Sequence, residues 1–244
     1  MITNAAGGLQ RRQVDYKGRA DMVTDVDRRA EEIILDGIRR AYPAHAVLAE
    51  ESGKNETQSD YCWIVDPLDG TTNFVHDYPF YCVSIAVQYH QETVAAVVLN
   101  PVMGELFSAI KGGGAHLNGN PITVSSTSEL SKTLLATGFP YQIGESWQHS
   151  MTLFESFYRN CHGVRRDGAA ALDLCYMAAG RFDGFWEYEL QPWDVAAGLL
   201  IVQEAGGKTT DFQDNPSGIY DGQVLASNGR IHDEMLRVMR KHPS

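Results

Sequence analysis

The alternation of apolar and polar residues predicts strands through most of the first half of the chain. Short apolar or alternating runs that are bounded by glycine, proline or polar residues are typical of strands. We expect them at residues 46–49, in the run that leads to Asp66, at residues 83–89, 93–99 and 105–110, and around the turns at residues 112–114 and 118–121. Residues 1–125 are therefore predicted to be strand-rich and antiparallel in character.

The second half, residues 126–244, alternates strands with longer alanine-rich segments. We expect strands at residues 134–137, 163–166, 182–187 and 223–227, and helices at residues 145–160, 169–179, 194–205 and 231–240. Gly180 follows the second of these helices at a position suited to the left-handed cap. Such alternation predicts an α/β layer that packs against the earlier sheet, so that both halves form one domain spanning residues 1–244.

One amphipathic helix is predicted between residues 24 and 42. Thr24, Asp25 and Asp27 provide a cap and acids for the first turn, and Pro43 ends the helix. Its apolar positions follow the i, i+3, i+4, i+7 pattern of a buried face. They are Ala30, Ile33, Ile34, Gly37, Ile38 and Ala41.

Composition and charge limit the possible partners. Hydrophobic residues make up 43% of the chain and charged residues 21%, which is ordinary for a globular protein. The 20 basic and 31 acidic residues give a net charge of −11, which argues against nucleic acid as a partner. An acidic chain can still take an anionic substrate if metal ions reverse the local charge.

The chain also carries no pattern typical of a membrane or secreted protein. No stretch reaches the roughly 18 apolar residues of a membrane span. The N-terminus lacks the apolar core of a signal peptide. The four cysteines show no C-x-x-C spacing and are interpreted as reduced thiols. We therefore expect a cytoplasmic protein.

The strongest chemical motif lies where one apolar strand ends. Asp66 and Asp69 are three residues apart, and Gly70 and Thr71 follow at the start of an expected short helix. The two carboxylates and the Leu68 carbonyl can face one hard cation. The free N–H groups of a helix start suit a phosphate. The motif therefore predicts a site for metal-assisted phosphate chemistry.

Three other acids stand at expected strand ends or helix starts. Taken alone, Asp27 is explained as a helix-dipole partner, Glu50 as a solvated strand end and Asp194 as an N-cap. Together with the first pair, they provide the four or five oxygen ligands that a two-metal site needs. Such sites suit phosphate monoester hydrolysis, one of the slowest uncatalysed reactions.

Five ordered motifs resemble those of the inositol monophosphatase family, and the resemblance covers nearly the whole chain. The signature is Asp66-Pro67-Leu68-Asp69-Gly70-Thr71-Thr72-Asn73-Phe74. The others are Ala49-Glu50-Glu51-Ser52, Asp21-Met22-Val23-Thr24 leading to Asp27, Asn118-Gly119-Asn120-Pro121-Ile122 and Pro192-Trp193-Asp194-Val195-Ala196-Ala197-Gly198. Residues 165–168 and 178–184 are most similar to those of bacterial members.

The resemblance implies an α+β fold, an αβαβα layered sandwich, and assigns roles to particular residues. Two or three Mg²⁺ ions per site would be held by Glu50, Asp66, Asp69, Asp194 and the Leu68 carbonyl. Thr71 and Asp27, together with Glu50, would act on the attacking water. Substrate contacts would come from Asp69, Gly70, Thr71, Arg165, Ala170, Glu187 and Asp194. Lys17 would lie in a loop near the metals. Residues 5–12 would form the end of an N-terminal helix that is shorter than in other members of the family.

The implied activity is Mg²⁺-dependent hydrolysis of inositol 1-phosphate or related small polyol or sugar phosphates. Thr72 stands where relatives that act on nucleotide 3′-phosphates typically carry lysine, which favours this substrate class. Fructose 1,6-bisphosphate and histidinol phosphate remain alternative substrates. Some bacterial relatives instead act as accessory proteins of the transcription machinery. The resemblance further implies a homodimer and inhibition by lithium.

Overall fold

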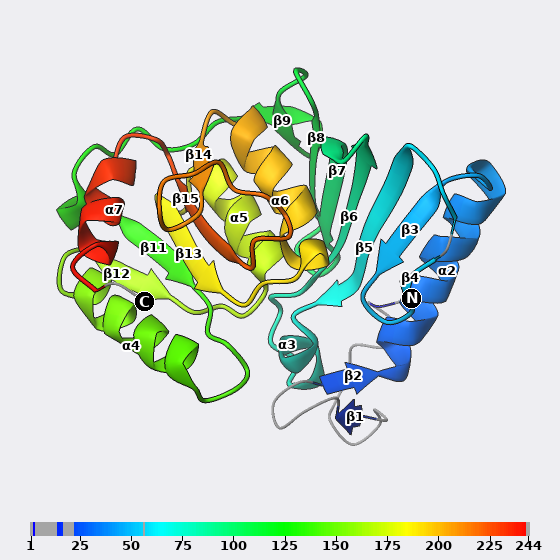
Figure 1. Cartoon of the computed structure of the whole chain (residues 1–244), viewed down its shortest axis with the longest axis horizontal. Coiled ribbons are helices and arrows are strands. Elements are labelled where there is room, and N and C mark those ends of the chain that lie inside the picture. Colours follow the sequence, from blue (N-terminus) through cyan, green and yellow to red (C-terminus); the bar gives the residue numbers. More distant parts are fainter. Residues whose placement is uncertain (1, 3–13, 17–21, 56, 243–244) are drawn as a thin grey trace.

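The computed structural model describes residues 2, 14–16, 22–55 and 57–242 (Figure 1). The helix end expected at residues 5–12, Lys17 and Asp21 lie outside the described residues. None of the helices in the described part combines the length and the apolarity that crossing a membrane requires. All four cysteines are described and none forms a disulfide, in agreement with their interpretation as thiols.

The first half forms an eight-stranded sheet in the order β10-β9-β8-β7-β6-β5-β3-β4. Its strands are β3 Ala46–Ala49, β4 Gly53–Lys54, β5 Tyr61–Asp69, β6 Cys82–Tyr89, β7 Glu92–Asn100, β8 Glu105–Ile110, β9 Ala115–Leu117 and β10 Asn120–Ile122. All neighbours are antiparallel except β3 and β5, which run parallel. The antiparallel prediction is thus confirmed apart from that pair. A separate hairpin joins β1 Val14–Tyr16 to β2 Met22–Thr24.

The helix α2 (Asp25–Ala41) packs against the face of this sheet formed by β3 and β5. Thr24 caps it as predicted. The predicted buried face is wrong in part: Ile33 is 60% exposed, and Gly37 and Ala41 are exposed as well. The buried positions are Val26, Asp27, Ala30, Glu31, Leu35 and Ile38.

Hydrogen bonds explain why α2 turns two of its own acids, Asp27 and Glu31, toward the sheet. Asp27 accepts a hydrogen bond from Thr71, and Glu31 accepts one from the backbone N–H of Glu51 at 2.9 Å. These partners lie on the sheet side of the helix, so the apolar stripe is rotated away from Ile33. Periodicity alone does not reveal such partners, because it counts acids as solvent-facing.

The second half forms a five-stranded sheet in the order β12-β11-β13-β15-β14. Its strands are β11 Leu134–Thr137, β12 Gly163–Arg165, β13 Gly184–Tyr188, β14 Lys208–Thr210 and β15 Gln223–Ser227. The first three run parallel, and β15 is antiparallel to both β13 and β14. The short polar strand β14 is an element that the hydrophobic pattern did not predict.

Helices fill the space between the two sheets and cover the outer face of the second (Figure 1). The inner pair is α5 Ala170–Ala178 and α6 Pro192–Glu204, the outer pair is α4 Glu145–Tyr158 and α7 His232–Met239, and the short elements are α3 Thr71–Val75 and a 3-10 turn at Leu130–Lys132. A Cβ on Gly198 would lie 2.6 Å from the Leu174 side chain, so glycine permits the close approach of α5 and α6. The layers run helix, sheet, helices, sheet, helices, which confirms the αβαβα sandwich.

Candidate active site

The predicted signature lies at the end of β5, between the two sheets. The register of β5 against β6 shifts between Asp66 and Asp69, so the strand is irregular where the two acids stand. Oδ1 of Asp66 accepts a hydrogen bond from the Leu68 N–H at 2.9 Å, and Oδ2 of Asp69 accepts one from the Ala171 N–H at 2.8 Å. One oxygen of each carboxylate is thus fixed by backbone. Among the described residues, the second oxygen of each accepts no hydrogen bond, which leaves it for a ligand.

Gly70 forms the turn that follows these acids. Its φ of 90° lies in the left-handed region. A Cβ there would lie 3.0 Å from the Phe80 carbonyl oxygen and 3.2 Å from Cβ of Ala169. Both the backbone conformation and the close packing therefore require glycine at the start of α3.

Glu50 and Asp194 reach the same place from other elements. Since β3 and β5 are parallel neighbours, Glu50 follows β3 at the sheet edge where β5 presents its acids, and its N–H bonds to the Val65 carbonyl at 3.1 Å. Asp194 is the third residue of α6, and it accepts a hydrogen bond from the Gln191 N–H at 2.7 Å. The predicted N-cap role of Asp194 is therefore wrong, because Gln191 is the cap and Pro192 opens the helix.

These residues line a small cavity of about 40 Å³. Its walls are formed by Glu50, Asp66, Leu68, Asp69, Gly70, Thr71, Thr72, Tyr141 and Asp194. None of these lining residues is basic. The structure thus brings together all five residues predicted to hold Mg²⁺, although Glu50 and Asp194 are distant along the chain from the other three.

Burial and mutual repulsion control the charge state of the acids. Asp66 is 2% exposed, and burial, followed by the charges of Glu50, Asp69 and Asp194, raises its pKa well above the usual range. Burial and the neighbouring Asp194 raise the pKa of Asp69 to about 8. Protein groups alone therefore favour the protonated acids, whereas a divalent cation would favour the ionised forms.

The carboxylates fit a divalent cation in their chemistry, although they do not enclose one as they stand. Oxygen donors of this kind are the ligands that Mg²⁺ prefers. In the described part of the chain, no three acidic, histidine or cysteine side chains already form a closed set of metal ligands. Repelling carboxylates are expected to stand apart, so a bound ion would have to draw them together.

Thr71 connects the cavity to the cap of α2. Its Oγ1 lies 2.9 Å from Oδ1 of Asp27 and 3.0 Å from the Leu68 carbonyl oxygen. Oδ2 of Asp27 accepts hydrogen bonds from the N–H and the hydroxyl of Thr24. Burial raises the pKa of Asp27 even though these hydrogen bonds oppose the shift. Asp27 is thus both a capping-box residue and the partner of the cavity hydroxyl.

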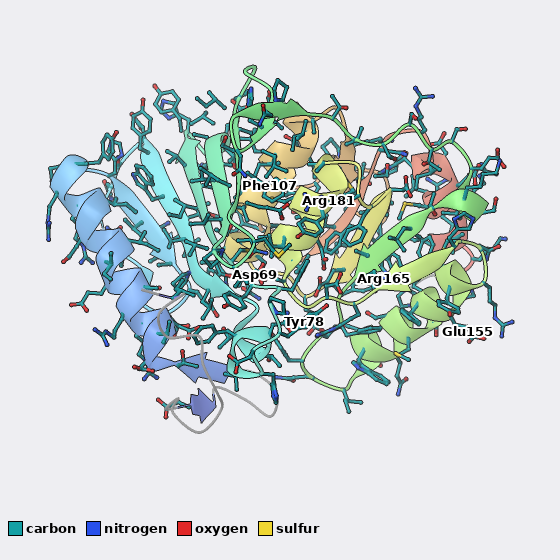
Figure 2. All side chains as sticks on the ribbon, turned by 180° about the vertical axis from the view of Figure 1, so that it is seen from behind. Asp69, Tyr78, Phe107, Glu155, Arg165 and Arg181 are labelled. Atoms are coloured by element: carbon teal, nitrogen blue, oxygen red, sulfur yellow. The ribbon has the colours of Figure 1, made fainter. Side chains whose placement is uncertain are left out.

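The other predicted substrate contacts are less uniform. Burial and the charge of Asp194 raise the pKa of Glu187 to about 8. Ala170 opens α5 immediately before Ala171, whose N–H holds Asp69. Arg165 lies on β12, next to α4, and is exposed outside the residues that line the cavity (Figure 2). The structure therefore places Glu187 and Ala170 close to the acids but does not bring Arg165 into the cavity.

Sequence reasoning missed two residues near the site. Tyr141 lines the cavity from the loop after β11, and no local pattern marks it. Asp173 is buried in α5, its Oδ1 has no hydrogen-bond partner in the described part of the chain, and burial raises its pKa. An acid within an alanine-rich apolar helix was a signal that could have identified Asp173.

Comparisons with known proteins show which family the chain resembles over its length. The sequence model described as "Inositol monophosphatase family" matches residues 1–244. The chain belongs to the inositol monophosphatase family. It is 46% identical over 233 residues to an inositol-1-monophosphatase of Synechocystis sp., covering 95% of this chain and 81% of that protein. It is 45% identical over 229 residues to the Nus factor SuhB of Escherichia coli K12, covering 93% of this chain and 86% of that protein.

Solved structures of the family share the fold. A crystal structure of the extragenic suppressor protein suhB from Bartonella henselae matches with a TM-score of 0.94 and 41% identity, covering 99% of this chain and 93% of that one. An IMPase/NADP phosphatase complexed with Mg²⁺ and phosphate matches with a TM-score of 0.82 and 25% identity, covering 94% of this chain and 87% of that one. The chain is thus a member of a phosphatase family.

Proposed function

We propose that this chain is a Mg²⁺-dependent phosphomonoesterase that hydrolyses inositol 1-phosphate or related small polyol or sugar phosphates. The observation that carries the proposal is the convergence of four carboxylates on one cavity beside the Thr71–Asp27 hydrogen bond. Buried acids of like charge are costly unless a cation joins them. The family assignment supports the reaction class.

Mg²⁺ ions held by Glu50, Asp66, Asp69, Asp194 and the Leu68 carbonyl would acidify a bound water and neutralise charge on the phosphate. The Thr71 hydroxyl donates to Asp27, so its oxygen can accept a hydrogen bond from the attacking water. The water oxygen attacks phosphorus, the phosphorus–oxygen ester bond breaks, and the water proton passes through Thr71 toward Asp27. The leaving oxygen takes up a proton from a solvent water and departs as the alcohol, and Asp27 returns its proton to solvent.

The backbone also contributes to phosphate binding in this proposal. Gly70 and Thr71 line the cavity at the start of α3, where N–H groups have no partner within the helix. Such groups can donate to phosphate oxygens. Glu187 and Ala170 lie near enough to the acids to contact the alcohol part of a substrate. Arg165 would reach the substrate only if its side chain moved.

A panel of small phosphates tests the proposal directly. Phosphate release is measured with and without Mg²⁺ and Li⁺ for inositol 1-phosphate, fructose 1,6-bisphosphate, histidinol phosphate and several sugar phosphates. We expect release only with Mg²⁺, inhibition by Li⁺ and the highest kcat/KM for a polyol phosphate. A more than tenfold preference for fructose 1,6-bisphosphate or histidinol phosphate would replace the substrate that we propose.

The name of the Escherichia coli relative favours a second candidate function, in which the chain binds the transcription machinery. The net charge of −11 disfavours RNA or DNA, so the partner that we propose in this case is a protein. Retention of RNA polymerase by immobilised Asp69→Asn protein would support this function. Absence of retention would count against it, whatever the phosphatase activity.

The outer face of β7 and β8 supports a homodimer. Leu99 and Leu106 are cross-strand neighbours, and Val97 and Ile110 lie on the same face, opposite the side covered by α6. Their exposed fractions range from 36% for Val97 to 68% for Ile110. A two-fold interface would bury the same apolar patch on both copies. Light scattering should report a dimer for the wild type and a monomer for the Leu99→Glu, Ile110→Glu double variant, and a monomeric wild type would contradict the proposal.

A further inference from the structure

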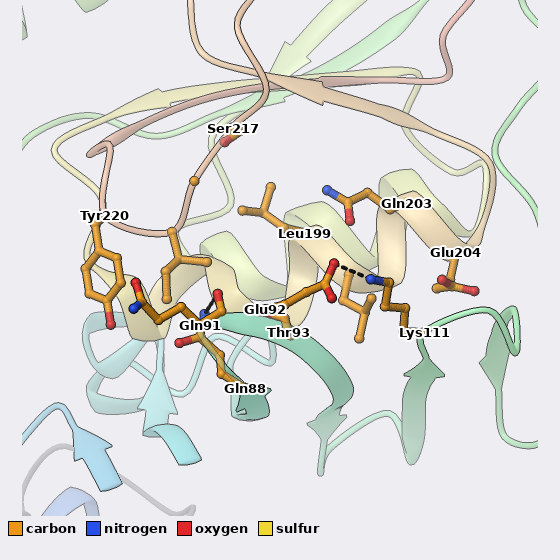
Figure 3. A pocket seen from close by; sticks show the side chains of 13 residues that line it. Gln88, Gln91, Glu92, Thr93, Lys111, Leu199, Gln203, Glu204, Ser217 and Tyr220 are labelled. Carbon is orange, nitrogen blue, oxygen red and sulfur yellow. Dashed lines mark hydrogen bonds and ion pairs between the residues drawn. The ribbon is translucent and has the colours of Figure 1, made fainter. Parts of the chain in front are cut away.

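A second cavity, of about 300 Å³, shares no residue with the acidic one. It lies between the C-terminal half of α6, the turn from β6 to β7 and residues 217–220 (Figure 3). Its size is at the lower end of the roughly 300–1,000 Å³ of small-molecule sites. The proposed hydrolysis uses none of its residues.

One buried polar group in its wall lacks a partner. Oγ of Ser217 is buried and has no hydrogen bond to any described residue. The side chain of Gln88 is only 4% exposed, and its Nε2 donates to the Gln91 carbonyl oxygen at 3.1 Å. Buried polar atoms are nearly always paired, so the Ser217 hydroxyl indicates a missing ligand or solvent partner.

The charged groups of this cavity are already compensated within the chain. The Lys111 ammonium group pairs with Glu92. The two carboxylate oxygens of Glu204 accept hydrogen bonds from the N–H groups of Gly112 and Gly114, each at 2.8 Å. A phosphorylated ligand would find no uncompensated cation here. An uncharged ligand fits better.

The turn that borders the cavity adopts an unfavourable backbone conformation. His90 and Gln91 both have positive φ values, 48° and 67°. Asparagine and glycine adopt this two-residue turn far more easily than these residues do. The hydrogen bond from Gln88 to the Gln91 carbonyl holds the turn and places Gln91 at the cavity wall.

We propose that this cavity binds a neutral polyol of about the size of a hydroxylated six-carbon ring. Gln88, Gln91 and Ser217 offer amide and hydroxyl groups to its hydroxyls, while Leu199 and Leu200 provide an aliphatic surface for its carbon skeleton. A nucleobase would require flat surfaces on both faces, and Tyr220, 63% exposed, is the single aromatic residue among those lining the cavity.

Calorimetric titration of the whole chain with myo-inositol, in chelator and without Mg²⁺, tests this site. We expect millimolar binding by the wild type and equal binding by Asp69→Asn, which alters only the acidic cavity. Ser217→Ala should weaken binding about fivefold, since one neutral hydrogen bond is lost. Because that hydroxyl has no partner among the described residues, the melting temperature of the ligand-free variant should not fall. Gln88→Leu should weaken binding further and should also destabilise the turn.

Several outcomes would overturn the proposal. One is absence of binding at tens of millimolar myo-inositol. Another is binding that is lost in Asp69→Asn but kept in Ser217→Ala and Gln88→Leu, which would locate the polyol in the acidic cavity. Tighter binding of adenine than of myo-inositol would overturn the ligand class. Because no turnover is measured, failure of the proposed phosphatase activity would leave this test unaffected.

Discussion

The acidic cavity differs in the compensation of its polar groups from the second cavity, which is called the amide-lined cavity after Gln88, Gln91 and Gln203 in its wall. In the first, buried carboxylates raise one another's pKa, and no lining residue is basic. In the second, charged side chains are matched by an ion pair and by backbone N–H groups. The acidic cavity therefore requires a cation to balance its carboxylates. The charges of the amide-lined cavity are balanced within the chain, and it lacks only neutral hydrogen-bond partners.

Removing one acid should produce the largest effect. We expect Asp69→Asn to lower Mg²⁺-dependent phosphate release by about a thousandfold or more, because a metal ligand is lost at the reacting centre. The metal-free variant should be at least as stable as the wild type, since asparagine can still accept from Ala171 and adds no repulsion. Phosphate-release kinetics and thermal unfolding in chelator measure both effects. The exposed Asp60→Asn is the matched control, and retained activity in Asp69→Asn would refute the acidic site.

Removing the Thr71 hydroxyl, which donates a hydrogen bond to Asp27, should have the next largest effect. Thr71→Val removes the group that orients the attacking water, and we expect kcat to fall about 300-fold. Thr71→Ser keeps the hydroxyl and should retain most of the activity. Equal kcat values for these two variants would show that the hydrogen bond to Asp27 has no part in the reaction.

The pH dependence of stability tests the cost of burying a charged group outside both cavities, at His232. His232 is 1% exposed, and its two ring nitrogens lie within hydrogen-bond distance of Ser227 and Thr210. Burial, aided by Lys208, lowers its pKa to about 4, below the usual value of about 6.5. Between about pH 6.5 and about pH 4, His232 is protonated in the unfolded chain but neutral in the folded chain. The free energy of unfolding therefore decreases as the pH falls from about 6.5 to about 4.

The expected contribution of His232 to that loss is about 3 kcal/mol. Denaturant unfolding of the wild type and of His232→Gln is measured at several pH values in this window. The difference between their unfolding free energies gives the contribution of His232. The variant should be less stable at neutral pH and should show a shallower pH dependence. Parallel pH curves for the two proteins would contradict the assignment.

The smallest effect should be stabilisation by ligand. Mg²⁺ at ten times its Kd should add about 1.4 kcal/mol to the unfolding free energy, or a shift of about 3 to 6 °C in Tm. Asp69→Asn should lose most of that shift, and Ser217→Ala should keep it. No shift at millimolar Mg²⁺ would remove the contrast between the two cavities.

Local sequence predicted most elements because local interactions determine them. The strand β8 begins and ends at the predicted residues, and α2 begins after the predicted cap at Thr24. β14 was missed because a three-residue polar strand has no period to detect. The buried face of α2 was misplaced because Asp27 and Glu31 have partners elsewhere in the chain.

For the site, the sequence by itself determined the group from Asp66 to Thr71, because neighbouring residues share one turn whatever the rest of the chain does. Tertiary structure decided the remainder: the parallel pairing of β3 with β5 carries Glu50 to that turn, and the start of α6 carries Asp194. Asp27 meets Thr71 across 44 residues. The resemblance named these partners, but their convergence, the cavity wall at Tyr141 and the amide-lined cavity depend on how the layers pack, since only packing brings distant polar groups within a few ångströms of one another.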